Sequence, residues 1–372
     1  MMKKKTILFF IYQMGGGGAA RTLLNIINNI DRTQFTPILV TLDYNGSYEE
    51  YLLDDVTFIK LKTKRLRSAI FPLAKLIRQT KADIVFSTIP NYNTIAILGR
   101  VFSFTRAKNI VREAAFLGGS RKENIKLWAY GLLYRLASKV IALSHGVKDN
   151  VIQRYHVNPE KIRVIYNPVD LETIQKKSTS GTIQPEHQPI FAGEEKVIVT
   201  AGRLVDDKDH ETLLRAFAKV HQHIKSRLVI LGEGELEQKL KSLAKELGIE
   251  ETVHFAGFQT NPYVYFKQAD LFVLSSKREG FGHVLAEALA VGTPIVSTAC
   301  KPGAVEVLDH GKYGKLSPIG DADALAENMM DVLTLGEAER EQIIEKGLER
   351  ASEFNAKTIV KQYEEVFHQT FD

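Results

Sequence analysis

The sequence predicts an α/β protein with two parallel sheets in tandem, each covered by helices on both faces. Short apolar runs alternate along the 372 residues with segments whose apolar residues recur at helical spacing. This alternation breaks once, between residues 176 and 193, in a stretch rich in Ser, Thr, Gly, Gln and Pro, and then restarts. Two such blocks predict two Rossmann-like domains, with ligand sites at the carboxyl ends of their strands.

The first block contains six predicted strands, each a short run rich in Ile, Val, Leu or Phe. They cover residues 6–11, 36–41, 83–87, 108–111, 140–143 and 162–165. The segments between them have an apolar face at helical spacing, which predicts helices. These cover residues 20–30, 48–53, 68–79, 92–100, 124–137 and 145–155.

The second block repeats the pattern and closes with two helices. Its predicted strands are 196–201, 227–231, 253–256, 271–274 and 294–297. Its predicted helices are 211–223, 236–247, 283–290, 323–334, 337–353 and 355–369. We therefore divide the chain into a first domain (1–175), a linker (176–194), a second domain (195–353) and a C-terminal helix (354–372). We expect this last helix to pack back toward the first domain.

Composition narrows the class of protein further. The 44% hydrophobic and 25% charged residues are typical of a globular protein and argue against a disordered chain. The single cysteine, Cys300, excludes an intrachain disulfide, and we expect it to pack in a core, as we do for the only tryptophan, Trp128. No run of about 18 apolar residues occurs, so no membrane-spanning helix is expected.

Glu279 and Glu287 flank a glycine turn and the start of a predicted helix. The turn is Gly280-Phe281-Gly282. Glycines let a backbone approach a ligand closely, and the free N–H groups at a helix start attract an anion. A nucleotide sugar carries hydroxyls on both sides of a diphosphate, so this layout suits such a ligand. A solvated helix face with a glycine cap is the alternative interpretation.

The segment from Ser275 to Ala288, followed by residues 290–296, resembles the E-x7-E motif of the retaining glycosyltransferases of family 4. The resemblance implies the GT-B fold, in which two Rossmann-like domains with parallel sheets face each other across a cleft. It implies that Glu279 contacts the donor sugar and that Glu287 binds the ribose hydroxyls. The other donor-binding residues implied for this segment are Gly280, Phe281, Gly282, His283 and Val284.

Two further parts of the second domain are expected at the donor. Gly202 and Arg203 end a predicted strand, and Lys208 follows closely. Arginine offers a fork of donors and lysine a point charge, which suit a diphosphate, although surface salt bridges would explain the same residues. This element resembles the family's pyrophosphate-binding Gly-Arg-Leu…Lys element. The turn at Phe258 resembles the one that receives the nucleobase.

In the first domain, a glycine run that includes Gly17 and Gly18 joins the first strand to the first helix. It resembles the family's Gly-Gly-Ala-Glu-Arg turn, with Ala20 where Glu is usual, and implies a contact with donor phosphates or acceptor. A flexible turn is the alternative. Glu113 ends another strand and is a candidate general base for the acceptor hydroxyl. It could equally be a structural partner of Arg112.

No metal or cofactor is implied. The ten histidines are scattered, and no Asp-x-Asp precedes a site in the first domain. Asp321-Ala322-Asp323 lies late in the chain and is typical of a helix N-cap.

Charge is distributed unevenly along the chain. Residues 1–180 hold 28 Lys and Arg against 13 Asp and Glu, a net +15, whereas the remainder is net −10. The segment Lys60–Lys81 has eight cations and no acid, with apolar residues at helical spacing from residue 70 on. We expect an anionic acceptor or membrane surface on this side. An ordinary helix packed on a sheet is the alternative, and no nucleic-acid module is recognisable.

These features predict a retaining hexosyl- or N-acetylhexosaminyltransferase. Its donor is a nucleotide-diphosphate sugar, with UDP expected by family frequency alone. Its acceptor is a glycan or lipid-linked molecule of cell-surface polysaccharide synthesis. We expect it in the cytoplasm, peripheral at the inner face of the plasma membrane. A nucleotide-sugar 2-epimerase and a non-catalytic nucleotide-sugar-binding subunit remain alternatives. A dehydrogenase is disfavoured because no Gly-x-Gly-x-x-Gly turn with a following acid is found.

Overall fold

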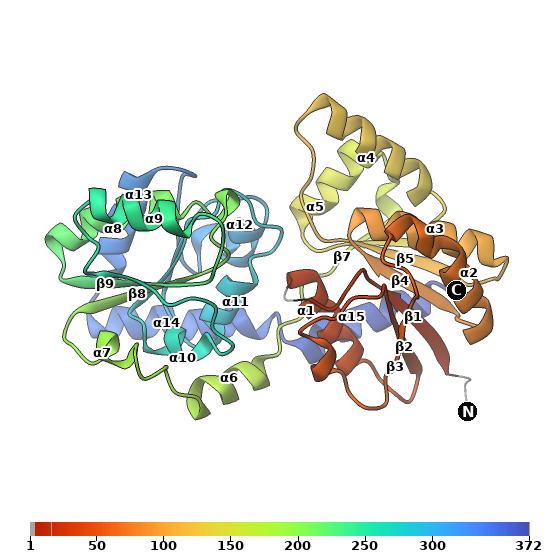
Figure 1. Ribbon diagram of the computed structural model, residues 1–372, viewed down its shortest axis with the longest axis horizontal. Coiled ribbons are helices and arrows are strands. Elements are labelled where there is room, and N and C mark those ends of the chain that lie inside the picture. Colours follow the sequence, from red (N-terminus) through yellow and green to blue (C-terminus); the bar gives the residue numbers. More distant parts are fainter. Residues whose placement is uncertain (1–3, 16, 372) are drawn as a thin grey trace. The chain divides into compact units, whose positions relative to one another are not determined.

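A computed structural model describes residues 4–15 and 17–371 (Figure 1). Contacts divide the chain into two compact units, which are described separately. The first unit comprises residues 1–169 and 356–372, and the second comprises residues 170–355. In the part of the chain described, no helix combines the length and the apolar character needed to cross a bilayer.

The first unit is built on a parallel seven-stranded sheet in the order β3-β2-β1-β4-β5-β6-β7. The pairing of β1 with both β2 and β4 makes it a central strand. The strands are β1 (Lys5–Phe10), β2 (Phe35–Thr41), β3 (Thr57–Lys60), β4 (Ile84–Thr88), β5 (Lys108–Glu113), β6 (Lys139–Ala142) and β7 (Ile162–Val164).

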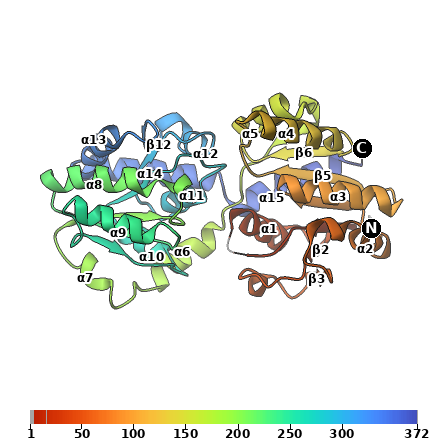
Figure 2. The same cartoon turned by 45° about the horizontal axis from the view of Figure 1, so that its top comes forward.

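Helices cover both faces of this sheet (Figure 2). Ile7 and Phe9 of β1 join a core with α1 and α15, whereas Leu8 and Phe10 join a second core with α2 and α3. Alternate side chains of the strand are therefore buried on opposite faces, as expected for a parallel sheet. The helices are α1 (Gly18–Asn29), α2 (Ile70–Thr80), α3 (Pro90–Ser103), α4 (Arg121–Tyr134), α5 (His145–Asn150, continued by a π-helical turn Val151–Tyr155) and α15 (Ala356–Gln369).

The second unit has a parallel six-stranded sheet in the order β10-β9-β8-β11-β12-β13. Its strands are β8 (Lys196–Ala201), β9 (Ser226–Leu231), β10 (Val253–Phe255), β11 (Leu271–Leu274), β12 (Ile295–Thr298) and β13 (Lys315–Ser317). Its helices are α6 (Leu171–Ser180), α7 (Gln188–Phe191), α8 (His210–His223), α9 (Glu237–Glu246), α10 (Tyr263–Gln268), α11 (His283–Ala290), α12 (Gly303–Val307), α13 (Ala322–Leu333) and α14 (Glu337–Ser352). Its core gathers α8, α9 and α13 around the strands.

The polar stretch expected as a linker is partly helical and lies in the second unit. Asp170 caps α6 by accepting a 3.0 Å hydrogen bond from the Thr173 amide. Ile174, Ile183 and Ile190 are buried. Buried isoleucines, together with hydrogen bonds to Tyr265 and Asn261, thus anchor a segment whose composition is that of a loop. The C-terminal helix α15 packs in the core of the first unit through Tyr363 and its apolar neighbours.

Each sheet reverses its strand order once, between β1 and β4 in the first unit and between β8 and β11 in the second. At such a switch point the loops that leave two adjacent strands diverge, and open α/β sheets bind ligands in the crevice that results. The loops after β8 and β11 contain Arg203, Lys208 and Glu279. The topology thus brings together residues that lie about 70 positions apart in the sequence.

Candidate active site

An ion pair joins the two loops at the switch point of the second sheet. The Lys208 ammonium, in a 3₁₀ turn after β8, contacts the Glu279 carboxylate in the loop after β11. The two side chains are only 22% and 14% exposed. In such a partly desolvated place, charges interact more strongly than at the open surface. Two residues that sequence analysis assigned to one ligand are therefore in contact.

Neighbouring loops fix the position of Glu279. The Ser276 hydroxyl donates a 2.9 Å hydrogen bond to the same Oε1 that meets Lys208. The Gly303 amide donates a 3.0 Å hydrogen bond to the Glu279 carbonyl, and Pro302 forms a parallel bridge with Glu279. The loop after β12 thus supports the loop after β11.

Hydrogen bonds from the loop after β11 also fix the backbone around Lys208. The Ser275 hydroxyl donates a 3.0 Å hydrogen bond to the Lys208 carbonyl, and the Lys277 amide donates a 2.9 Å bond to the Asp207 carbonyl. Farther out, Lys277 pairs with Asp206 at 2.7 Å. These bonds tie the loop after β8 to the loop after β11 along its length.

The Gly280-Phe281-Gly282 turn requires its glycine and buries its aromatic ring. Gly282 has a φ of +83°, in the left-handed region, and precedes the first residue of α11. The Phe281 ring packs edge-on against Phe354 at 5.2 Å and His283 at 5.4 Å. The turn therefore places the start of α11, and with it the first N–H groups of that helix, at the switch point. Of the other predicted residues, Val284 is half-buried and Glu287 is buried on the second turn of the helix.

Glycines also let the ends of β8, β9 and β10 approach closely. The Gly202 amide donates to the Leu231 carbonyl at 2.9 Å, and the Gly232 amide donates to the Gly257 carbonyl at 2.8 Å. Gly232 has a φ of +142°, and a Cβ there would lie 2.0 Å from the Gly202 oxygen. Only glycine fits this contact, which positions the turn that carries Arg203.

Arg203 and Phe258 are both exposed at this edge of the sheet. Within residues 4–15 and 17–371, the Arg203 guanidinium forms no ion pair. An exposed cation and an exposed aromatic ring at strand ends are available to a ligand with phosphate and a base.

The structure adds a residue that sequence analysis missed. His210, the first residue of α8, is buried, and its Nδ1 has no hydrogen-bond partner among the described residues. Burial, and secondarily the charge of Lys208, lowers the pKa of His210 to about 4. The imidazole is therefore neutral beside Lys208 at pH 7. A histidine at the start of an amphipathic helix carries no distinctive sequence signal.

The predicted first-domain glycines lie at the start of α1. The Gly17 amide donates a 2.8 Å hydrogen bond to the Gly15 carbonyl, and Gly18 is the first residue of the helix. A Cβ on Gly17 would meet nothing within 4 Å, so the backbone here is open. Gly16 lies outside the described residues. The contact of Gly17 and Gly18 with a donor stays a prediction.

Glu113 is fully buried at the end of β5. Its carboxylate accepts hydrogen bonds from the hydroxyls of Tyr134 and Tyr155, the latter at 3.1 Å, and from the Asn93 amide at 3.1 Å. Burial raises the pKa of Glu113 to about 7, against the lowering effect of these donors. Both oxygens are engaged inside the unit. This geometry favours a structural role, and the catalytic assignment stays a prediction.

Arg112 does not pair with Glu113. Its guanidinium donates to the Thr88 hydroxyl at 2.9 Å, to the Tyr363 hydroxyl at 3.1 Å and to the Asn167 side chain. The two side chains form no direct ion pair among the described residues, but the charge of Arg112 lowers the pKa of Glu113, so the structural partnership between them stays a prediction. Arg112 instead links β5 to the C-terminal helix α15.

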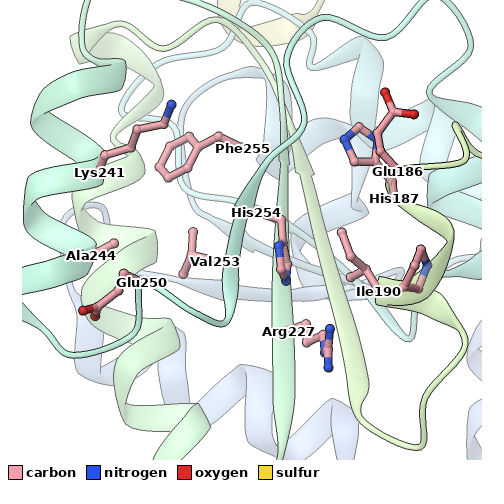
Figure 3. Close-up of a pocket in the computed structure, with 11 residues that line it drawn as sticks. Glu186, His187, Ile190, Arg227, Lys241, Ala244, Glu250, Val253, His254 and Phe255 are labelled. Carbon is pink, nitrogen blue, oxygen red and sulfur yellow. The ribbon is translucent and has the colours of Figure 1, made fainter.

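Neither a metal cluster nor the pocket beside β10 coincides with these residues. No group of three or more His, Cys, Asp or Glu side chains in the described part of the chain could hold a metal ion. A pocket of about 550 Å³ runs along the outer edge of β10, between α9 and the α7 segment (Figure 3). Lys241 lines it on one side and His187 on the other, with His254 and Arg227 between them. It contains none of the predicted site residues.

Comparison with known proteins identifies the class of this chain. Residues 16–173 match the model of the family described as Glycosyltransferase Family 4, and residues 183–350 match that described as Glycosyl transferases group 1. The chain is 29% identical over 311 residues to the N-acetylgalactosamine-N,N'-diacetylbacillosaminyl-diphospho-undecaprenol 4-alpha-N-acetylgalactosaminyltransferase of Campylobacter jejuni, covering 82% of this chain and 79% of that one.

Two further similarities agree with this result. The lipopolysaccharide core biosynthesis glycosyltransferase LpsE of Rhizobium meliloti is 33% identical over 168 residues, which cover 45% of this chain and 48% of LpsE. The crystal structure of Anabaena HepE in complex with UDP and glucose superposes with a TM-score of 0.82 at 22% identity, covering 98% of this chain and 100% of that one. The two parallel sheets and these matches together show that the chain is a glycosyltransferase with the GT-B fold.

Proposed function

We propose that this chain transfers a hexosyl or N-acetylhexosaminyl group, with retention of configuration, from a UDP-sugar to a lipid-linked or glycan acceptor of cell-surface polysaccharide synthesis. The observation that carries the proposal is the contact of Lys208 with Glu279 at the switch point of the second sheet, with the exposed Arg203 in the same loop after β8 as Lys208. The Campylobacter relative supports the acceptor class, because its name specifies a diphospho-undecaprenol substrate. The UDP bound to HepE supports the donor class.

The chemistry breaks the bond between the anomeric carbon and the diphosphate oxygen. Negative charge then grows on the diphosphate and positive charge on the sugar. Arg203, Lys208 and the first N–H groups of α11 stabilise the diphosphate, and preorganised charge of this kind is usually the largest catalytic contribution. The carboxylate of Glu279 orients the sugar through its hydroxyls.

The incoming acceptor hydroxyl must lose a proton. In the proposed front-face route, the departing phosphate oxygen takes this proton, so the sugar is transferred to the same face and no side-chain nucleophile is required. Glu113 is enclosed by Tyr134, Tyr155 and Asn93, and the route proceeds without it. The neutral His210 next to Lys208 adds no charge that would oppose the lysine.

The remaining donor contacts follow the motif. Glu287 binds the ribose, the backbone of Gly280, Gly282 and His283 faces the diphosphate, and the turn at Phe258 receives the nucleobase. The first unit supplies the acceptor side, because its positive charge suits a diphosphate-linked acceptor at an anionic membrane face. The reaction as proposed uses neither a metal nor a bound cofactor.

The test replaces Arg203, Lys208 and Glu279 singly by Ala and measures sugar transfer with saturating donor. We expect each change to lower the rate by about 10²–10³, because loss of one charged transition-state contact costs ~3–4 kcal/mol. Lys239→Ala is the matched control, since this exposed lysine pairs with Glu211 between α8 and α9. Near-normal rates in all three variants contradict the site. Altered sugar released without acceptor would identify an epimerase instead.

A further inference from the structure

Helix α4 of the first unit carries an apolar stripe on its exposed side. Ile125, Trp128 and Leu132 lie on it at spacings of three and four residues, and Leu136 follows just beyond the helix. Their exposed fractions are 60%, 48%, 41% and 48%. Spacings of three and four place residues on one face of a helix. The only tryptophan of the chain, which was expected to pack in a core, is therefore half exposed.

The opposite side of α4 is firmly packed, so the stripe does not result from a loosely placed helix. Leu127 and Tyr134 are buried. Gly131 lies so close to the π-helical turn that a Cβ there would be 1.7 Å from the Tyr155 carbonyl oxygen. Figure 1 shows α4 at the outer side of the first unit, with α5 and α3 on its inner side. Helix α4 is thus apolar on two faces, and only one of them has a partner within the unit.

Cations border the stripe. Arg121, Lys122, Lys126 and Arg135 are all exposed. The only acid of the helix, Glu123, is used in a capping box with Ser120, whose hydroxyl accepts a 3.2 Å bond from the Glu123 amide. An apolar stripe with a tryptophan, bordered by lysine and arginine, matches the interface of an anionic bilayer: rings and aliphatic chains enter the acyl boundary and cations meet the headgroups.

Helix α2, in the basic segment Lys60–Lys81, lacks this combination. Its Leu73, Ala74 and Ile77 are buried in the core of the unit. Among its large apolar side chains only Phe71 is exposed, and its ring packs against Phe102 of α3 at 5.4 Å. The cations of Lys60–Lys81 can add attraction to an anionic surface, but the apolar face of α2 is already covered. The alternative interpretation of this segment, a helix packed on a sheet, therefore describes α2.

We infer that α4 is the element by which this chain docks on an anionic lipid bilayer, with Ile125, Trp128, Leu132 and Leu136 inserted at the headgroup boundary. Only the purpose of this docking rests on the proposed function: it brings the first unit to an acceptor held in the membrane. Strand β5 leads through residues 114–120 directly into α4. The stripe therefore begins at the carboxyl edge of the sheet, where ligand sites are expected.

The experiment measures binding of the full chain to vesicles of phosphatidylcholine alone and of phosphatidylcholine with 30% phosphatidylglycerol. Because Trp128 is the only tryptophan, its emission reports on α4 itself. We expect a blue shift with the anionic vesicles, quenching by lipids brominated on the acyl chains, and neither change with phosphatidylcholine alone. The double variant Ile125→Asn/Leu132→Asn should bind at least tenfold more weakly. Lys122→Gln/Lys126→Gln should lose about fivefold per removed cation.

Matched controls separate α4 from other exposed apolar residues. Phe71→Ser on α2 and Ile319→Asn in the second unit should bind as the unchanged chain does. Equal binding by the α4 variant, binding without any change in Trp128 emission, or a dimer in solution that α4 substitutions dissociate would each overturn the inference. Transfer to a short, water-soluble acceptor should persist in the α4 variant. Failure of membrane docking is thereby distinguished from failure of the proposed reaction.

Discussion

Lys208 and Glu279 form an ion pair, and this pairing solves a physical problem of the proposed donor site. A cation prepared for a diphosphate is costly to desolvate alone, as is a carboxylate prepared for sugar hydroxyls. Each serves as the counter-charge of the other, and in the proposed reaction a ligand with both phosphate and hydroxyls takes over these contacts. The Ser276 hydroxyl shares the same carboxylate oxygen. The proposed donor site would thus use a cation and a carboxylate that are already in contact.

Glu113 should make the stability of the first unit depend on pH. Its folded-state pKa of about 7 lies above the ordinary value of 4.5. The folded chain thus holds the proton more tightly, and the contribution of Glu113 to the free energy of unfolding is complete below pH 4.5. That contribution is lost as the pH rises through about 7, and it amounts to roughly 3 kcal/mol.

Hydrogen exchange of the β5 amides, followed from pH 5 to pH 8, checks this expectation. The protection of the unchanged chain should fall with pH relative to that of Glu113→Gln, which cannot ionise. Taking the difference between the two proteins cancels other titrating groups of the unit, including Glu364 on α15, whose pKa burial also raises. Parallel profiles for the two proteins would show that Glu113 does not titrate in this window.

Some of these residues could be predicted from sequence and others could not. Glu279, Arg203 and Lys208 each stand in a motif of fixed spacing, and the strand order explains why distant motifs meet. Glu113 shows the opposite case, because nothing local indicates that Tyr134 and Tyr155 enclose its carboxylate. Burial of a polar group depends on contacts distant in sequence, which periodicity does not report.

At the scale of elements, close backbone approaches decide which loops can support the site. Gly303 begins α12 and packs against the turn at Phe281, where an added Cβ would lie 2.7 Å from the Phe281 backbone. Backbone atoms cannot rotate away as a side chain can. The Gly-Phe-Gly turn therefore keeps its position only while residue 303 is glycine.

Gly303→Ala should consequently displace the turn, lower the stability of the second unit by about 1–3 kcal/mol, and weaken donor binding. Denaturation together with calorimetric titration of a UDP-sugar measures both effects. Gly193→Ala is the matched control, because a Cβ there meets only the Glu195 amide nitrogen at 3.9 Å. If Gly303→Ala binds the donor as tightly as the control does, the turn is not part of the donor site.

Elements with strong periodicity were predictable, and short ones were not. All six predicted strands of the first unit correspond to observed strands. Strand β3 (Thr57–Lys60) was not predicted, because it has only four residues and most of them are half-exposed. Residues 48–53 were expected to be helical, yet only a 3₁₀ turn forms at Glu49–Tyr51. Such segments acquire their structure from the sheet edge or loop beside them.

At the scale of the whole molecule, the two units differ in charge and in the kind of ligand surface they present. The excess of cations in the first unit accompanies the exposed α4 stripe, whereas the second unit combines glycine-built strand ends with a paired cation and carboxylate. Each unit has cores of its own. Ligands of the two units should therefore stabilise different parts of the chain, which makes the proposed donor assignment testable without turnover.

A nucleotide-sugar donor should stabilise the second unit selectively. A ligand that binds only the folded state at 100 times its Kd adds about 2.7 kcal/mol to the free energy of unfolding. We expect UDP-sugars to raise Tm more than GDP-sugars, and to slow hydrogen exchange at residues 201–208 and 275–285 while leaving β5 unchanged. Lys208→Ala should diminish both effects.

Protection from hydrogen exchange confined to the pocket beside β10 would place the donor elsewhere. A larger rise in Tm with GDP-sugars than with UDP-sugars would identify guanine as the nucleobase of the donor. Full protection in a chain that transfers no sugar to any acceptor would indicate a nucleotide-sugar-binding subunit, because the same contacts would then serve recognition alone.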